Sequence, residues 1–168
     1  MIKKYNELIK FLEKSEYSFD KNLIKKHCID WREEFLGTSN LIIFPKSVKK
    51  LSKIVQICNK KDIKIVPQGG NTGLVGGSVP RKNKNEIIIN FSKLNKIREI
   101  DLIGSSITIE SGCILENIKN ELLKYNLEFP LSMGSRGNCQ IGGNISTNAG
   151  AVNVIKYGTL RHNILGLE

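Results

Sequence analysis

The stretch Pro67–Pro80, PQGGNTGLVGGSVP, is rich in glycine and carries no acidic or basic side chain. It lies between two apolar runs, IKIV at 63–66 and EIIINF at 86–91, in a chain otherwise crowded with lysine. Glycine permits positive φ angles and lets a backbone approach a ligand, because no Cβ stands in the way. Successive N–H groups of such a turn can point into one concavity and bind an anion. The stretch therefore predicts a loop that holds a pyrophosphate with neutral backbone donors.

The residues before this loop predict a strand, a helix and a second strand. LIIF at 41–44 is typical of a short buried strand, and Ser47 is a suitable N-cap for the helix that follows. The apolar face of that helix consists of Val48, Leu51, Ile54, Val55 and Cys58. With IKIV as the second strand, the pattern predicts a parallel pair with a right-handed crossover. The loop then leaves the carboxyl end of a parallel strand, where open α/β sheets usually bind ligands.

The remaining segments have simpler patterns. Residues 2–12 predict an amphipathic helix, and residues 15–40 are polar and irregular. After the loop, the runs at 86–91, 96–101 and 105–111 predict two or three further strands with tight connections. A helix is expected after Gly112, with an apolar side formed by Ile114, Leu115, Ile118, Leu122 and Leu123. The last six residues, NILGLE, have the pattern of a strand just beginning.

A second glycine-rich stretch, Phe129–Ala151, is predicted to be irregular. Neutral polar residues in the two stretches offer donors and acceptors for ribityl, ribose or ring edges: Asn71, Thr72, Ser78, Asn144, Thr147 and Asn148. The chain has no Gly-Lys pair, which a Walker loop requires, and no two glycines one residue apart, which a Rossmann fingerprint requires. Glycines that only form tight turns are the alternative interpretation, but two long loops with interleaved Asn and Thr favour a nucleotide site.

The composition narrows the class of protein. A chain of 168 residues with 40% hydrophobic residues predicts a packed core in one domain or part of a larger one. The net charge of +10 comes from scattered Lys and Arg without a helix-turn-helix, zinc-finger or RNP-like pattern, so no nucleic-acid partner is expected. The four cysteines and two histidines lack metal-ligand spacing, which predicts reduced thiols and no metal site. Neither a transmembrane segment nor a signal peptide is recognisable, and a cytoplasmic location is expected.

The stretch Pro67–Pro80 closely resembles the FAD pyrophosphate loop of the FAD-linked D-2-hydroxyacid dehydrogenases. This family includes D-2-hydroxyglutarate dehydrogenase, D-lactate dehydrogenase and the flavin subunit of glycolate oxidase. Residues 130–150 resemble the second flavin loop of the same family, and KYGTLRHNILGLE at 156–168 resembles the segment after it. The resemblance implies an α+β, vanillyl-alcohol-oxidase-type (PCMH-type) FAD-binding domain of two lobes over residues 36–168, preceded by a helical segment over 1–35.

The resemblance also implies FAD as the cofactor and assigns residues to it. On the pyrophosphate side it places Pro67, Gly69, Gly70, Asn71, Thr72, Gly73 and Leu74, with Ser78 nearby. On the adenosine and flavin side it places Gly134, Ser135, Gly142, Gly143, Asn144, Thr147, Asn148 and Gly150, followed by Tyr157 and Gly158. Ser132, Asn138 and Ala151 differ from the residues that are frequent at these positions in the family.

By this resemblance, the chain is the FAD-binding portion of an oxidoreductase that oxidises a D-2-hydroxy acid to the 2-oxo acid and passes electrons to a separate acceptor. The first lobe is expected to be complete and the second to be truncated. Catalytic and metal-binding residues belong to later parts of such enzymes, and none is assigned here. A completing chain is a further expected partner. The alternative is a non-catalytic flavin-binding fragment or a remnant of a split gene, whereas another enzyme on the same fold, such as a cell-wall precursor reductase, fits the first loop less well.

Overall fold

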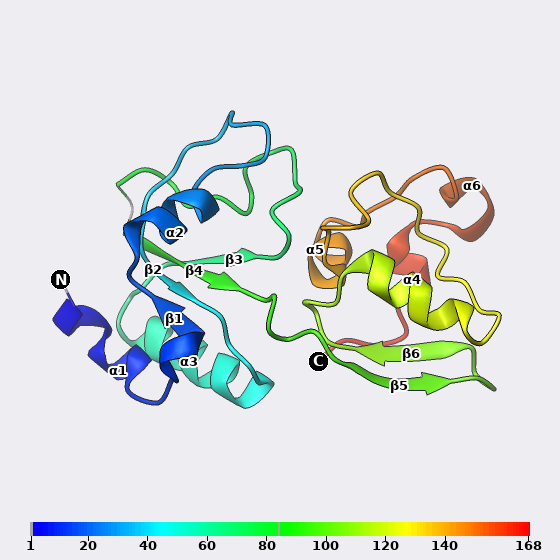
Figure 1. The fold of residues 1–168 in the computed structure, drawn as a ribbon, viewed down its shortest axis with the longest axis horizontal. Helices are drawn as coiled ribbons and strands as arrows, with labels where there is room; N and C mark the ends of the chain where they lie inside the picture. The colour runs from blue at the N-terminus through cyan, green and yellow to red at the C-terminus, as the bar shows by residue number, and fades with distance from the viewer. Residues whose placement is uncertain (1, 84) are drawn as a thin grey trace. The chain divides into compact units, whose positions relative to one another are not determined.

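The computed structural model describes residues 2–83 and 85–168. The chain divides between Leu94 and Asn95 into two compact units, each of which is described by itself. Both units combine helices with β-strands, as Figure 1 shows, so the predicted mixture of α and β structure is confirmed. The division at residue 35, between a helical segment and a cofactor domain, stays a prediction.

The first unit is built on a four-stranded sheet with the order β1-β2-β4-β3. Its strands are β1 (Tyr17–Ser18), β2 (Ser39–Ile43), β3 (Ile65–Gln68) and β4 (Glu86–Asn90). β2 and β3 each pair with β4 in parallel, and β1 is antiparallel to β2. β2 and β3 therefore run parallel as predicted, but the prediction that they pair directly is wrong, because β4 lies between them.

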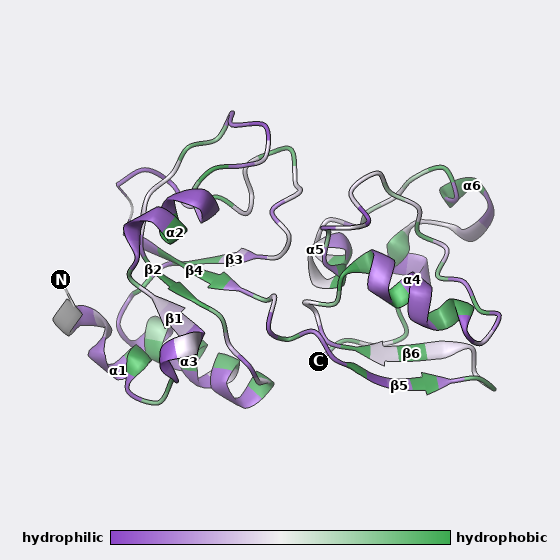
Figure 2. Cartoon of the chain, in the orientation of Figure 1, coloured by the Kyte–Doolittle hydropathy of each residue, from purple (hydrophilic) through white to green (hydrophobic). Residues whose placement is uncertain are grey.

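Helices cover both faces of this sheet. They are η1 (Ile2–Tyr5), α1 (Asn6–Ile9), η2 (Lys14–Glu16), α2 (Lys21–His27) and α3 (Val48–Lys60). In Figure 1, α2 and α3 lie on opposite sides of the sheet. Ile88 of β4 packs with α2, whereas its neighbours Ile87 and Ile89 pack with α1 and α3. Since side chains alternate between the faces of a strand, burial of both faces explains the unbroken isoleucine run in β4, which Figure 2 shows as a hydrophobic band.

Several local predictions for the first unit can be compared with the structure. The Ser47 side chain accepts a hydrogen bond from the Lys50 N–H at 3.3 Å, which confirms the predicted N-cap of α3. Val48 and Val55, which were assigned to the apolar face of α3, are 37% and 44% exposed. The segment at 15–40 was predicted to be irregular, but it contains the strand β1 and the helix α2, whose first N–H groups are capped by Asp20.

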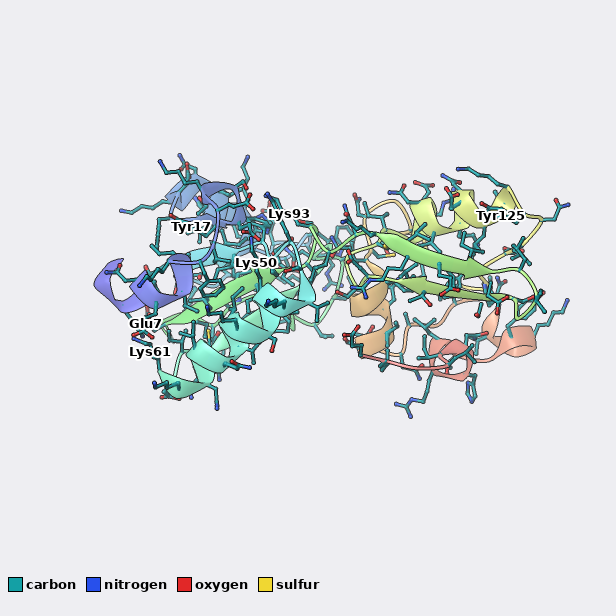
Figure 3. The ribbon with its side chains drawn as sticks, turned by 90° about the horizontal axis from the view of Figure 1, so that it is seen from below. Glu7, Tyr17, Lys50, Lys61, Lys93 and Tyr125 are labelled. Carbon is teal, nitrogen blue, oxygen red and sulfur yellow. The ribbon has the colours of Figure 1, made fainter. Side chains whose placement is uncertain are left out.

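The predicted N-terminal helix is a 3₁₀ turn followed by the single turn α1. It nevertheless packs as predicted, with Tyr5 and Leu8 buried in the core of the first unit. An ion pair of 2.8 Å between Glu7 and Lys61 links it to the end of α3, and Figure 3 shows these two side chains next to each other.

The second unit begins with β5 (Ile97–Asp101) and β6 (Ser106–Ile109), two strands that were predicted and that the structure pairs as an antiparallel hairpin. Its helices are α4 (Leu115–Leu123), α5 (Ile141–Ser146), α6 (Val154–Tyr157) and η3 (Leu160–Asn163). The core consists mainly of residues from α4, α5 and the segments between them: Cys113, Leu115, Ile118, Leu122, Leu131, Cys139, Ile141, Ala149 and Leu160. Leu123 was expected on the apolar side of α4 but is exposed.

Two expectations for the second unit are wrong. The glycine-rich stretch at 129–151 is not irregular throughout, because it contains the short helix α5. The last residues do not form the predicted strand, since η3 ends at Asn163 and residues 164–168 follow it without regular structure. Arg161 in η3 donates its main-chain N–H to Asn148, which ties this end of the chain to the second loop.

Candidate cofactor-binding loops

The first loop leaves the carboxyl end of β3 at Gly69 and runs to Pro80. Pro67, which the resemblance groups with the loop, lies in β3 at the edge of the sheet, where a residue without an N–H group is tolerated. Among the described residues, no acceptor receives a hydrogen bond from any main-chain N–H group between Gly69 and Ser78. A series of unpaired N–H groups is what an anion-binding loop requires, so these donors are available to a ligand.

The glycines of the first loop are of two kinds. Gly76 has a φ of 70°, and a Cβ at this position would lie 2.6 Å from Cδ1 of Phe35, so the fold itself requires glycine there. A Cβ built on Gly73 would meet no heavy atom within 4 Å. The fold therefore does not explain the glycine at position 73, whereas the close approach of a ligand to the backbone would.

Polar side chains hold the first loop in place. Ser78 donates its hydroxyl to Asn71 Oδ1 at 2.6 Å, and Asn71 Nδ2 donates to the carbonyl of Ile29 at 2.7 Å. Asn71 needs this support because its φ of 54° lies in the left-handed region. Of the other predicted contact residues, Thr72 is half-buried and Leu74 is exposed.

The second loop is held mainly by main-chain hydrogen bonds to the segment before α4. The Gly142 N–H donates to the Ser111 carbonyl at 2.8 Å, and the Ile141 N–H donates to the Cys113 carbonyl at 2.9 Å. A Cβ on Gly142 would lie 2.6 Å from the Ser111 Cβ and 2.9 Å from its carbonyl oxygen, so only glycine fits. Gly143 and Gly134 have no heavy atom within 4 Å of such a Cβ. The second loop thus contains both a packing glycine and open glycines, as the first does.

The polar residues predicted in the second loop are engaged within it. Asn144 is buried and directs Nδ2 to the Cys139 sulfur at 3.4 Å. Thr147 donates its hydroxyl to the Gly143 carbonyl at 3.0 Å, and Asn148, with a φ of 49°, accepts a hydrogen bond from the Arg161 N–H. These side chains stabilise the loop, and they can offer their remaining lone pairs and amide hydrogens to a ligand.

The other residues predicted on this side lie near the same loop. The Ser135 carbonyl accepts the N–H groups of Asn138 and Cys139 and starts the turn before α5. Gly150 is exposed, and Tyr157 is half-exposed at the end of α6. Gly158 follows with a φ of 74° that favours glycine. All residues that the resemblance assigns to the adenosine and flavin side therefore lie in the second unit.

Side chains of α4 anchor the start of the second loop. Lys119 Nζ lies 3.2 Å from the Phe129 carbonyl oxygen and 3.3 Å from that of Leu131. Glu116 pairs with Arg136 across 3.1 Å between Oε1 and Nε. Sequence patterns do not reveal these anchors, because each joins residues that the fold, not the local sequence, brings together.

The cysteines of both units are buried thiols. All four cysteines are free and buried, and burial raises the pKa of the Cys58 thiol to about 11. Burial also raises the pKa of Cys28 and Cys113.

The positive charge of the chain belongs to the first unit. After Leu94 the number of Lys and Arg residues equals the number of Asp and Glu residues, so the net charge of +10 comes from residues 1–94. This charge favours an anionic ligand in the first unit. In the parts of the chain that the structure describes, no three His, Cys, Asp or Glu side chains are grouped so as to hold a metal ion, and no helix is long and apolar enough to cross a membrane.

Residues 39–168 match a protein family described as an FAD binding domain. The chain belongs to the FAD-binding domain family. Over 149 residues this FAD-binding chain is 42% identical to the mitochondrial D-2-hydroxyglutarate dehydrogenase of Danio rerio, covering 89% of the chain and 28% of the relative. Over 139 residues it is 44% identical to the D-2-hydroxyglutarate–pyruvate transhydrogenase of Saccharomyces cerevisiae, covering 83% of the chain and 28% of the relative. The resemblance to FAD-linked D-2-hydroxyacid dehydrogenases is thereby confirmed.

The fold of this FAD-binding chain also occurs in solved structures. An alkyldihydroxyacetonephosphate synthase matches it with a TM-score of 0.87 at 22% identity, over 96% of this chain and 32% of that protein. Identity at this level supports the fold alone. The chain thus spans about 28% of the length of the two relatives and 32% of this structure.

Proposed function

We propose that the chain binds FAD and that the first loop holds the pyrophosphate of the cofactor. The observation that carries this proposal is the series of main-chain N–H groups from Gly69 to Ser78, which find no acceptor among the described residues. A pyrophosphate offers oxygen acceptors to such donors, and the excess of positive charge in the same unit attracts it over a longer range.

The residues present fit this cofactor. Gly69 to Leu74 would contact the pyrophosphate, with Asn71 and Ser78 fixing the shape of the loop. In the second loop the open glycines Gly134 and Gly143 leave room for the adenosine and flavin side. When bound, FAD supplies a flavin ring that accepts a hydride. The part of the chain itself is to bind this cofactor and orient it.

We further propose that the chain is the FAD-binding portion of an oxidoreductase that oxidises a D-2-hydroxy acid to the 2-oxo acid. The names of the two relatives support this substrate class, since both include D-2-hydroxyglutarate. An electron acceptor and a completing chain are proposed as partners. A cytoplasmic location is also a proposal, and cell fractionation would test it.

The test is the flavin absorbance of the purified 168-residue chain, together with FAD titration of two variants. Gly73→Leu adds a side chain where the protein has open space, so helix content should stay unchanged while FAD affinity falls at least about tenfold. Gly166→Leu is the matched control, because a Cβ there also meets nothing within 4 Å. Equal FAD affinity of Gly73→Leu and the unchanged chain would contradict the assignment of the first loop.

A turnover assay separates the enzyme from the non-catalytic alternative. FAD-loaded chain would be mixed with D-2-hydroxyglutarate or D-lactate and a redox dye. Dye reduction that depends on the D-enantiomer supports an oxidoreductase. Bound FAD without turnover favours a flavin-binding chain with no activity of its own.

A further inference from the structure

Gln68, the last residue of β3, is a polar side chain in a core position. It is only 1% exposed, although the sheet around it is built from isoleucine and valine. Burying an amide is unfavourable unless its donors and acceptor are all paired. The hydrogen-bond partners of the Gln68 amide therefore indicate the role of this buried side chain.

The nitrogen of the Gln68 amide has two fixed partners. Nε2 lies 2.8 Å from the carbonyl oxygen of His27 and 2.9 Å from the carbonyl oxygen of Ser78. Carbonyl oxygens only accept, so the amide nitrogen must face them and both of its hydrogens are used. These two bonds connect the end of α2 to the far end of the first loop.

The oxygen of the same amide receives two donors. Asn90 Nδ2 lies 3.3 Å from Gln68 Oε1, and the orientation of Asn90 is fixed because its Oδ1 accepts the Ser92 N–H at 3.0 Å. His27 Nδ1 lies 2.6 Å from Gln68 Oε1. Since an amide oxygen can only accept, His27 must carry a hydrogen on Nδ1. The main-chain carbonyls thus determine the tautomer of the histidine through the orientation of Gln68.

The network around Gln68 shapes the loop and leaves its main-chain donors unused. Gln68 holds the Ser78 carbonyl, Ser78 holds Asn71, and Asn71 holds the Ile29 carbonyl. None of these bonds involves an N–H group of the backbone between Gly69 and Ser78. The network can therefore position the loop while every one of these N–H groups stays available to an anion.

We propose that Gln68 is a positioning residue for cofactor binding: its buried amide, held between His27, Asn90 and Ser78, keeps the first loop in the conformation that presents its N–H groups. This inference rests on the proposed binding of FAD. Gln68 acts through Ser78 and His27, because its own donors and acceptor are already paired.

The test compares Gln68→Glu with the matched control Gln56→Glu, an exposed position on α3. A carboxylate cannot donate to the carbonyls of His27 and Ser78, so the first variant loses both bonds. We expect FAD affinity to fall at least about tenfold in Gln68→Glu and to change less than about twofold in the control. In the absence of FAD, the ¹H–¹⁵N signals of Gly69–Ser78 should move in the first variant only.

A measurement on the unchanged chain keeps the inference testable even if Gln68→Glu does not fold. The imidazole ¹⁵N shifts of neutral His27 should show the hydrogen on Nδ1. A hydrogen on Nε2, or unchanged FAD affinity in a folded Gln68→Glu variant, would overturn the inference. If the proposed function itself is wrong, the unchanged chain will not bind FAD. In that case the His27 tautomer and the ¹H–¹⁵N signals of the loop still decide whether Gln68 positions the loop.

Discussion

In the first loop, the side chains of Gln68, Asn71 and Ser78 make the hydrogen bonds that fix the chain. In the second loop, main-chain groups around Gly142, together with the helix α5, do most of this. Both loops are rich in glycine and both are assigned to one cofactor by resemblance. The difference lies in which groups remain free, since a loop held by side chains keeps its main-chain N–H groups unpaired.

This difference predicts which substitutions each loop tolerates. The first loop should be sensitive to substitution of its polar side chains, because their hydrogen bonds determine its shape. The second loop should be sensitive to substitution of glycines such as Gly142, where a Cβ would clash with a neighbouring residue, because close main-chain contacts determine its shape. The open glycines of both loops should affect cofactor binding without affecting folding.

The largest effect on stability is expected from an ion pair of the first unit that lies outside the glycine-rich loop. Glu16 is fully buried and forms an ion pair with Lys50 of α3. Lys50→Met would leave this carboxylate without its ion-pair partner, with only the N–H groups of Glu13 and Lys46 still donating to it, and would destabilise the first unit by about 3 kcal/mol. Urea unfolding followed by signals of each unit measures this, with the exposed Lys49→Met as control. An equal loss of stability in Lys49→Met would contradict the assignment to the ion pair.

The same carboxylate makes the first unit sensitive to acid. Burial acts to raise the pKa of Glu16, but hydrogen bonds from Lys50 and from the N–H groups of Glu13 and Lys46 outweigh it and lower the pKa. The stability from Glu16 is therefore present above its unfolded pKa and is lost as the pH falls through its lowered folded pKa. Glu16→Gln should flatten the acid limb of the stability curve, and an unchanged acid limb would show that other groups cause it.

The glycines of the first loop should give the next effect. Gly76→Ala combines a positive φ with a clash against Phe35, so we expect a loss of at least about 1–2 kcal/mol in stability. Gly73→Ala, in open space, should leave the stability of the free protein within about 0.5 kcal/mol. Thermal unfolding without FAD tests the pair, and equal losses would remove the distinction between packing and open glycines.

The matching pair in the second loop should give a similar effect. Gly142→Ala would press a methyl group against the Ser111 backbone and cost about 1–3 kcal/mol. Gly143→Ala meets no neighbouring atom, so it should leave stability nearly unchanged and weaken only FAD binding. If Gly142→Ala proved as stable as Gly143→Ala, the second loop would not depend on this close approach.

Local signals in the sequence predicted those parts of the fold that depend on local interactions. Ser47 caps α3 because its hydroxyl meets an N–H three residues away. The strands β2, β3 and β4 were placed to within a few residues, whereas β1 lies in a segment that was expected to be irregular. The glycine-rich stretch was correctly placed after the end of a strand. Asp20 forms the same kind of cap for α2, but this helix was not predicted because the residues around Asp20 are mostly polar and show no clear apolar periodicity.

Features that depend on distant residues could not be predicted in this way. The insertion of β4 between β2 and β3 is decided by packing on both faces of its isoleucine run. The helix α5 forms despite two adjacent glycines, which disfavour helices, because Gly142 fits against Ser111. The network of Gln68 joins α2, β4 and the first loop, so the residue itself gave only one signal, a polar side chain two positions after the buried Val66.

The most direct test of the central claim is a titration of the ¹⁵N-labelled chain with FAD, following the main-chain amide signals of Gly69–Ser78. If these N–H groups bind the pyrophosphate, their signals should shift downfield as they acquire acceptors, and the stretch should show the largest changes in the first unit. FAD binding that leaves these signals in place would contradict the claim and place the pyrophosphate elsewhere.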